Sequence, residues 1–388
     1  MSRRLRNQRC LERRSPVFQH NSMVTTITDG DVVQRLIHPA VFNKLNLSAV
    51  GIDGANLVVT DVRGASFTVM PSVTRQGGIE TREFHFPSGR MTIQRDGLEL
   101  LTEAFQRPAG TPGQEPERKV LRCALRDRQL DGTDRASPLS AFPNTHEATN
   151  RLPHPDFKAA ELSIYCYDPE RYLPAGEMLH FIMNVDEYIY KRFEPLEFFR
   201  LWTRAFAASN MAPWQPAPPL KGVAQHFVET AGLVLTEKGY NRMDAVCGFY
   251  NVAMFFIERM QFAFTYGEHE AAFRALQSGL KQLDERVGRQ LNLREQAWVV
   301  ALQNIPAAFI PEQMRLGSRW INSPTYTSYV CRLHKELVPF GRDPRLDKIS
   351  LPDAFAAGKT AASSGSSATG AAGLALPPAP KPVPPGKA

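Results

Sequence analysis

Arginine side chains crowd the first fifteen residues, MSRRLRNQRCLERRS, in which Glu12 is the one carboxylate. A guanidinium group can bind phosphate oxygens through two parallel hydrogen bonds, so several of them on a short segment indicate a phosphate-rich partner. We predict that residues 1–22 form a basic flexible arm that binds RNA. The arginines expected to contact phosphates are Arg3, Arg4, Arg6, Arg9, Arg13 and Arg14. The segment also fits a mitochondrial presequence, or an optional extension if translation starts at Met23.

The formal net charge of +7 is confined to the two ends of the chain. Residues 1–22 hold six arginines and one glutamate, and residues 351–388 hold three lysines and one aspartate, so residues 23–350 are formally neutral. A neutral body binds a polyanion only through a local patch of cations. The alternative for such cations is a solvated helix face of mixed charge. The cations expected to continue the phosphate-binding surface are Arg242, Arg274, Lys281, Arg289 and Arg294.

Sequence patterns typical of catalysis are missing or incomplete. The chain has no G-x-S-x-G and no H-E-x-x-H, and the segment DAFAAGKT at 353–360 has aspartate where a phosphate-binding loop needs its first glycine. Asp168 and Glu170 lie near Glu161 in the sequence and suggest a metal-dependent nuclease, although D-P-E after a strand is equally typical of a turn. We predict no catalytic residues, no metal site and no cofactor.

Cysteine usage indicates a reducing compartment. Five cysteines are spaced singly, which argues against a disulfide framework and against a zinc site. We expect ordinary thiols and a cytoplasmic location. The apolar run at 241–266 is interrupted by Glu258 and Arg259, so we expect a buried helix and no membrane insertion.

The periodicity predicts an α+β fold in which a β-rich domain precedes a helical one. Residues 23–170 are expected to form a small antiparallel sheet or a partly open barrel with long loops, because β-branched runs flank turn signals at 63–65 and 87–89. Residues 171–345 are expected to form a bundle of about seven helices from their 3.6-residue apolar spacing. Residues 346–388, rich in Pro, Ala, Ser and Gly, are predicted to be a disordered tail.

The predicted helices include 177–191, 195–208, 241–266, 268–289, 293–303, 311–321 and 323–337. Asp186 is expected on a solvated helix face. The many aromatic residues of 178–266 are expected in the core, whereas Trp214 stands in the proline-rich break APWQPAPPL and is expected to pin a loop or to contact a neighbouring subunit.

The layout of basic arm, helical body and low-complexity tail resembles that of helical nucleocapsid and filamentous coat proteins of RNA viruses. The tail segment AASSGSSATGAAGLALPPAPKPVPP also resembles, in composition, the proline-alanine-serine-rich RNA-coating proteins of some fungal viruses. The resemblance implies a self-associating protein that binds single-stranded RNA without sequence preference, and a location in the virion. The β-rich stretch 50–167 departs from both classes.

Two other functions stay open at this point. The Pro-rich tail suits an interaction or scaffold protein that presents a ligand to a partner's groove. An enzyme whose site is assembled from residues far apart in the chain is the third alternative.

Overall fold

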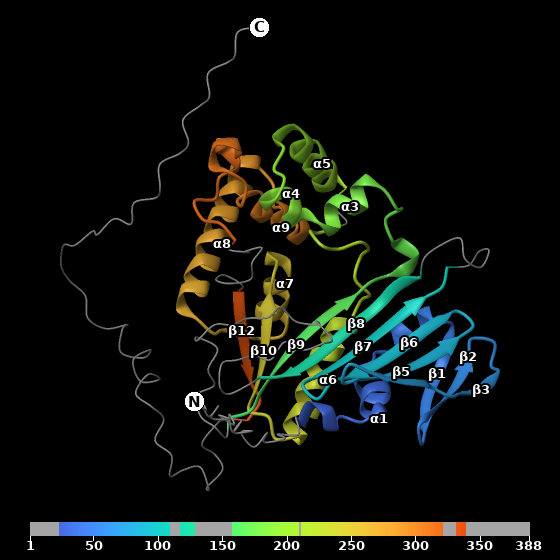
Figure 1. Ribbon diagram of the computed structural model, residues 1–388. Helices are drawn as coiled ribbons and strands as arrows, with labels where there is room; N and C mark the ends of the chain where they lie inside the picture. The colour runs from blue at the N-terminus through green and yellow to red at the C-terminus, as the bar shows by residue number, and fades with distance from the viewer. Residues whose placement is uncertain (1–22, 109–116, 129–156, 209–210, 321–330, 339–388) are drawn as a thin grey trace, which may run out of the picture. The chain divides into compact units, whose positions relative to one another are not determined.

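A nine-stranded mixed sheet dominates the computed structural model, which describes residues 23–108, 117–128, 157–208, 211–320 and 331–338 (Figure 1). In their order across the sheet, the strands are β11 (Ala263–Phe264), β12 (Cys331–Glu336), β10 (Arg242–Cys247), β9 (Ala159–Cys166), β8 (Arg118–Asp127), β7 (Glu99–Gln106), β6 (Gly89–Arg95), β5 (Ile79–Phe86) and β4 (Ser72–Gln76). All neighbours pair antiparallel except β9 and β10, which run parallel.

Local turn signals correctly predicted one hairpin of this sheet. β5 and β6 meet at the expected turn, where Phe86 pairs with Gly89. Glycine is required there because a Cβ atom at residue 89 would lie 2.0 Å from the carbonyl oxygen of Phe105 on β7.

The predicted succession of a small antiparallel sheet or barrel and then a helical bundle is wrong. β10, β11 and β12 come from the part expected to be helical, yet they extend the same sheet as β4 to β9. β10 has neighbours on both sides, and buried residues alternate poorly along it, so its apolar run resembled a helix. β12 pairs with β10 over its whole length, with Cys331 opposite Cys247. Because these two strands are far apart in the chain, no short-range sequence pattern indicates that they pair.

A second sheet, formed by strands from the N-terminal part of the chain, lies beside the first. It holds β1 (Leu47–Asp53), β2 (Asn56–Asp61) and β3 (Ser66–Val69) in that order, all antiparallel. The turn between β2 and β3 includes Gly64, as the sequence predicts, with φ of 88°.

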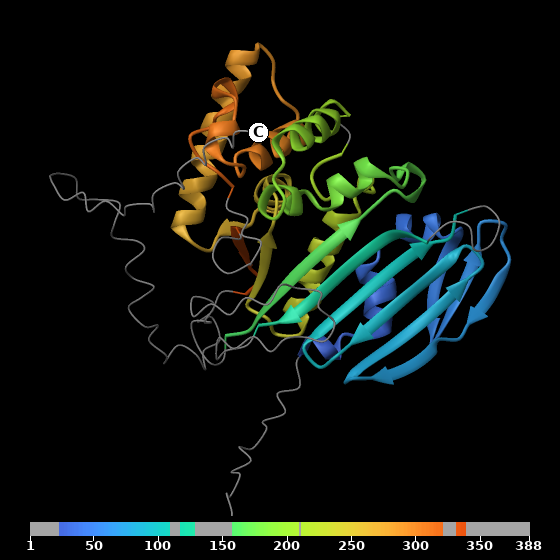
Figure 2. The same ribbon diagram turned by 45° about the horizontal axis from the view of Figure 1, so that its top comes forward.

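The main apolar core lies between the sheets and a layer of helices. This layer contains the 3₁₀-helix Met23–Thr26, α1 (Asp29–Asp31), the π-helix Val32–Leu36, α2 (Pro39–Lys44) and α6 (Val223–Glu237). Figures 1 and 2 show α6 and the N-terminal helices on the same face of the nine-stranded sheet. Phe227 on α6, Leu125 on β8 and Leu162 on β9 are among the buried side chains of this core.

A second apolar core is built mainly from the segment that connects β9 to β10. It contains α3 (Glu177–Met183), α4 (Val185–Tyr190) and α5 (Pro195–Ala207), and it is completed by α9 (Leu293–Leu302). Phe181 stacks on Trp298 with ring centroids 5.8 Å apart. The indole N–H of Trp298 donates to the carbonyl of Met211 at 2.7 Å. Pro195 occupies the first turn of α5, as predicted.

Other helices differ in part from the expected ones. The amphipathic helix α8 (Gly267–Val287) matches its prediction, although Val287 is exposed. The expected helix 241–266 is instead β10, α7 (Tyr250–Met254), the π-helix Phe255–Arg259 and β11. In the part of the expected helix 311–321 that the structure describes, residues 311–320, the one helical element is the 3₁₀-helix Glu312–Met314. Ala307–Phe309 forms another short 3₁₀ turn before it.

Candidate functional site

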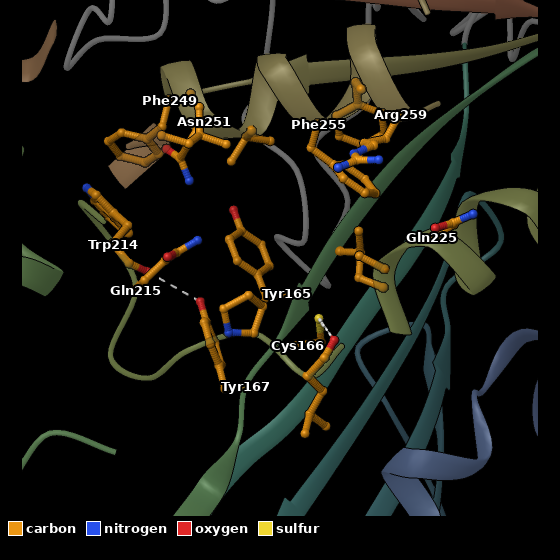
Figure 3. Close-up of a pocket in the computed structure, with 18 of the residues that line it drawn as sticks. Tyr165, Cys166, Tyr167, Trp214, Gln215, Gln225, Phe249, Asn251, Phe255 and Arg259 are labelled. Atoms are coloured by element: carbon orange, nitrogen blue, oxygen red, sulfur yellow. Dashed lines mark hydrogen bonds between the residues drawn. The ribbon is translucent and has the colours of Figure 1, made fainter. Parts of the chain in front are cut away.

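A cavity of about 880 Å³ opens where the parallel strands β9 and β10 end. Its walls come from the end of β9, the loop 213–222, α6, α7 with the following π-helix, and residues 292–294 (Figure 3). In open sheets, ligands bind beyond the carboxyl ends of parallel strands, where the chain departs in different directions. The topology therefore places the hollow at a position that suits a ligand.

Aromatic rings form much of the cavity wall. Tyr165 projects from β9 into the middle of the cavity, with Trp214 and Phe249 on one side and Phe255 on the other (Figure 3). Tyr165 is 43% exposed because the hollow is open to solvent. The rings of Trp214 and Phe249 lie 5.8 Å apart and support each other. The exposed ring of Tyr165 and the accessible parts of the half-buried rings can stack on a planar ligand.

Trp214 holds an unusual backbone conformation. Its φ of 64° lies in the left-handed region, which is unfavourable for a bulky side chain. Two hydrogen bonds hold this conformation. The backbone N–H of Trp214 donates to the carbonyl of Ile182 at 3.0 Å, and the backbone carbonyl of Trp214 accepts from the Tyr167 hydroxyl at 3.4 Å. Strained residues cluster at functional sites, where the fold compensates for their cost.

A π-helix continues α7 along the upper wall seen in Figure 3 and supplies its right-hand part. In this segment Met260 N–H donates to the carbonyl of Phe255 at 3.2 Å, five residues back. Phe255 and Arg259 both line the cavity from it. π-helical turns are rare and occur frequently at functional sites.

Three cations give the cavity its electrostatic character. Lys221, Arg259 and Arg294 line it, and no carboxylate is found among the described residues of its lining. None of the three side chains forms an ion pair with any residue whose position is described. Burial, together with the nearby charge of Arg171, lowers the pKa of Arg294. The cavity is therefore suited to an anion.

The predicted phosphate-binding residues do not all meet at this cavity. Arg294 lies in its wall. Arg289 is held by Glu295 through two hydrogen bonds of 2.7 and 2.8 Å, and Arg242 is paired with Asp244 at 2.6 Å. The remaining two lie on α8, outside the cavity: Arg274, which is 3.5 Å from Glu270, and the exposed Lys281. The arm arginines Arg3, Arg4, Arg6, Arg9, Arg13 and Arg14 lie outside the described residues.

Carboxylates that suggested a nuclease are engaged elsewhere. Glu161 is buried against Arg126 and Arg128, each at 2.7 Å. Asp168 and Glu170 both bind Lys44 at 3.0 Å. In the described ranges, no three His, Cys, Asp or Glu side chains are grouped to hold a metal ion.

Cys166 is the thiol at the cavity. Burial raises its pKa to about 11, so the sulfur is protonated at neutral pH and is a poor nucleophile. Its Sγ lies 3.9 Å from the carbonyl oxygen of Leu220. This contact belongs to packing between β9 and the loop before α6.

Sequence patterns pointed to only a few of the cavity residues. Trp214 was singled out by its proline-rich surroundings, and Arg294 by its charge. Tyr165 alternates with apolar neighbours in ELSIYCY, which indicated a strand but gave no hint that its outward side chain faces a cavity. Asn251 and Phe255 stood within the run misassigned to one helix.

No protein-family model, no curated protein and no solved structure matches this chain. Across the residues placed by the structure, no helix combines the length and the apolar character needed to cross a membrane.

Proposed function

We propose that this protein binds single-stranded RNA and that the cavity holds one of its nucleotides. The observation that carries the proposal is the combination of an aromatic wall with three cations, in a cavity whose placed lining residues include no carboxylate. Single strands are bound by cations that neutralise phosphates and by rings on which unstacked bases lie. Tyr165 and Trp214 offer the rings, and Arg259 and Arg294 lie where they can contact phosphates.

The same proposal gives the arm 1–22 a supporting role. Its arginines would add phosphate contacts outside the cavity and increase affinity without selecting bases. Self-association into a coat is the further part of the proposal, and it depends on the resemblance in sequence layout. Light scattering on the purified chain, with and without residues 1–22, tests it through the oligomeric mass and the co-purifying RNA.

The direct test compares RNA binding by cavity variants. A fluorescein-labelled single-stranded RNA of ten nucleotides is titrated with the wild-type protein, Arg259→Gln and Arg294→Gln, and anisotropy is recorded. We expect each substitution to weaken binding about tenfold, because each removes a charge-assisted hydrogen bond to phosphate. Arg63→Gln is the matched control, since Arg63 is exposed in the turn between β2 and β3.

Two outcomes would count against the proposal. One is an RNA affinity equal in all four proteins. The other is equal binding of a duplex of the same length, because paired bases cannot enter the cavity.

A further inference from the structure

The strand β4 lies at one edge of the nine-stranded sheet with its backbone open to a partner. It pairs with β5 on one side, and no described strand pairs with it on the other. All five of its residues are exposed, so neither of its faces is covered. The opposite edge of the sheet is protected by its shortness, because β11 has only two residues.

The hairpin between β4 and β5 determines which backbone groups of β4 are open. Its turn is the pair of glycines 77–78, whose φ angles of 60° and 83° are typical of a type I′ turn. Such a turn makes Gln76 and Ile79 a hydrogen-bonded pair, and bonded pairs then recur at every second residue. The backbone N–H and carbonyl groups of Val73 and Arg75 therefore point away from β5, toward the open edge.

A second copy of β4, running antiparallel, presents the matching groups. When two β4 strands meet about a two-fold axis at Thr74, Val73 of each copy lies opposite Arg75 of the other, and each pair exchanges two hydrogen bonds. An axis at Val73 would instead place Arg75 opposite Pro71, which has no N–H. An axis at Arg75 would place two arginines opposite each other. The register centred on Thr74 uses all four open groups of each strand.

The side chains are compatible with this register. Thr74 lies opposite Thr74 of the second copy, and β-branched residues pair well across strands. The charge of Arg75 is already compensated, because its guanidinium donates to Glu80 at 2.7 and 2.9 Å. Its alkyl stem can lie against Val73 of the second copy, a side chain that is 51% exposed in the single chain. The contact brings no two like charges opposite each other.

We propose that β4 is a self-association surface, on which a second copy of this chain adds its own β4 antiparallel about a two-fold axis at Thr74. The proposal rests on the self-association included in the proposed function and names its contact, but it does not require RNA binding. Five residues form few contacts, so a single pair is expected to be weak. It gains strength where several copies are held close together, as on one RNA strand.

Disulfide trapping tests the register. Thr74→Cys and Ser72→Cys are each prepared in a Cys10→Ser background, because the four cysteines with described positions are buried. Both proteins are oxidised with copper phenanthroline at equal, high concentration without RNA, and covalent dimer is measured on a non-reducing gel. In the proposed pair the Cα atoms at position 74 lie about 4.5 Å apart, within reach of a disulfide. Those at position 72 are offset by four residues, about 13 Å, which a disulfide cannot bridge.

We expect Thr74→Cys to yield at least about fivefold more covalent dimer than Ser72→Cys. Both positions are exposed and lie on the same face of β4, so the comparison is matched for thiol accessibility.

Val73→Pro tests the backbone pairing itself. Proline at position 73 removes an N–H that points to the open edge and leaves the hydrogen bonds to β5 in place. Added to Thr74→Cys, it should reduce the covalent dimer about fivefold or more, because each dimer loses two backbone hydrogen bonds. Val73→Ala keeps the N–H and is the matched control, which should retain most of the dimer. Thermal melting checks that the variants fold.

Three results would overturn this pairing. They are equal amounts of covalent dimer from positions 72 and 74, no dimer from either position, and a Val73→Pro variant that forms as much dimer as its parent. RNA binding is measured separately by the anisotropy titration. A failure of trapping with intact RNA binding overturns the β4 contact alone, and a loss of RNA binding with efficient trapping overturns the cavity proposal alone.

Discussion

Arg126 on β8 donates a hydrogen bond of 2.7 Å to Glu161 on the neighbouring strand β9, and both side chains are buried. The two residues are directly paired across the strands. Arg128 donates to the same carboxylate oxygen at 2.7 Å. Although burial acts to raise the pKa of Glu161, the guanidinium groups hold it well below its ordinary value. The carboxylate of Glu161 therefore stays charged inside the sheet because the neighbouring guanidinium groups compensate for its burial.

Removing that charge should destabilise the fold. Glu161→Gln removes the carboxylate that both buried guanidinium groups share, and we expect a loss of about 3–5 kcal/mol in the free energy of unfolding. Urea titration followed by circular dichroism measures it. Glu270→Gln on the exposed face of α8 is the control, and its loss should stay below about 1 kcal/mol. Equal effects of the two substitutions would refute the role assigned to Glu161.

Asp186 makes the stability of the fold depend on pH, because burial raises its pKa whereas ion pairs lower that of Glu161. The residue is partly buried, contrary to the expected solvated face, and burial raises its pKa to about 6 despite a contact with Trp214. The folded state then binds more protons than the unfolded state between about pH 4 and pH 6. The contribution of Asp186 to stability is therefore favourable below its unfolded pKa and is lost as the pH rises through 6.

Asp186→Asn should consequently stabilise the protein at neutral pH, by at most about 3 kcal/mol, and change little at pH 4. Urea titrations at pH 4, 5, 6 and 7.5 measure the difference between variant and wild type. A difference that is constant over this range would show that the carboxyl does not titrate as described.

The proposed stacking of a base on the Tyr165 ring can be tested separately from a contact with its hydroxyl. Tyr165→Ala removes the ring from the cavity, and we expect RNA affinity to fall about fivefold or more. Tyr165→Phe keeps the ring and should retain most of the affinity. The same anisotropy titration measures both, and equal losses in the two variants would mean that the hydroxyl, and not the ring, supports binding.

Arg289 should be dispensable for RNA binding although its charge made it a candidate. Its guanidinium is already bound on two sides by the carboxylate of Glu295, which also receives the N–H of Asn292 at the start of α9. We expect Arg289→Gln to lower the melting temperature and to leave the RNA affinity unchanged. A tenfold loss of affinity at unchanged melting temperature would place Arg289 in the binding surface.

Sequence patterns correctly predicted the features of the fold that are determined by residues close together in the chain. The turns before β3 and β6, the first turn of α5 and the buried stripe of α8 all follow from short-range spacing. β10 and β12 could not be predicted in this way, because their partner strands are distant in the chain and β10 lies inside the sheet. The cavity depends on that pairing, so Arg294 was identified by its charge while its surroundings were not.

The cavity walls come from residues 162–167, 213–225, 246–259 and 292–294. During synthesis on the ribosome, the hollow is therefore complete only after the chain has passed residue 294 and β10 has aligned with β9. Any molecule that occupies it bridges both apolar cores at once. Binding would then stabilise the folded chain, because it divides the ratio of unfolded to folded molecules by one plus the ligand concentration over its dissociation constant.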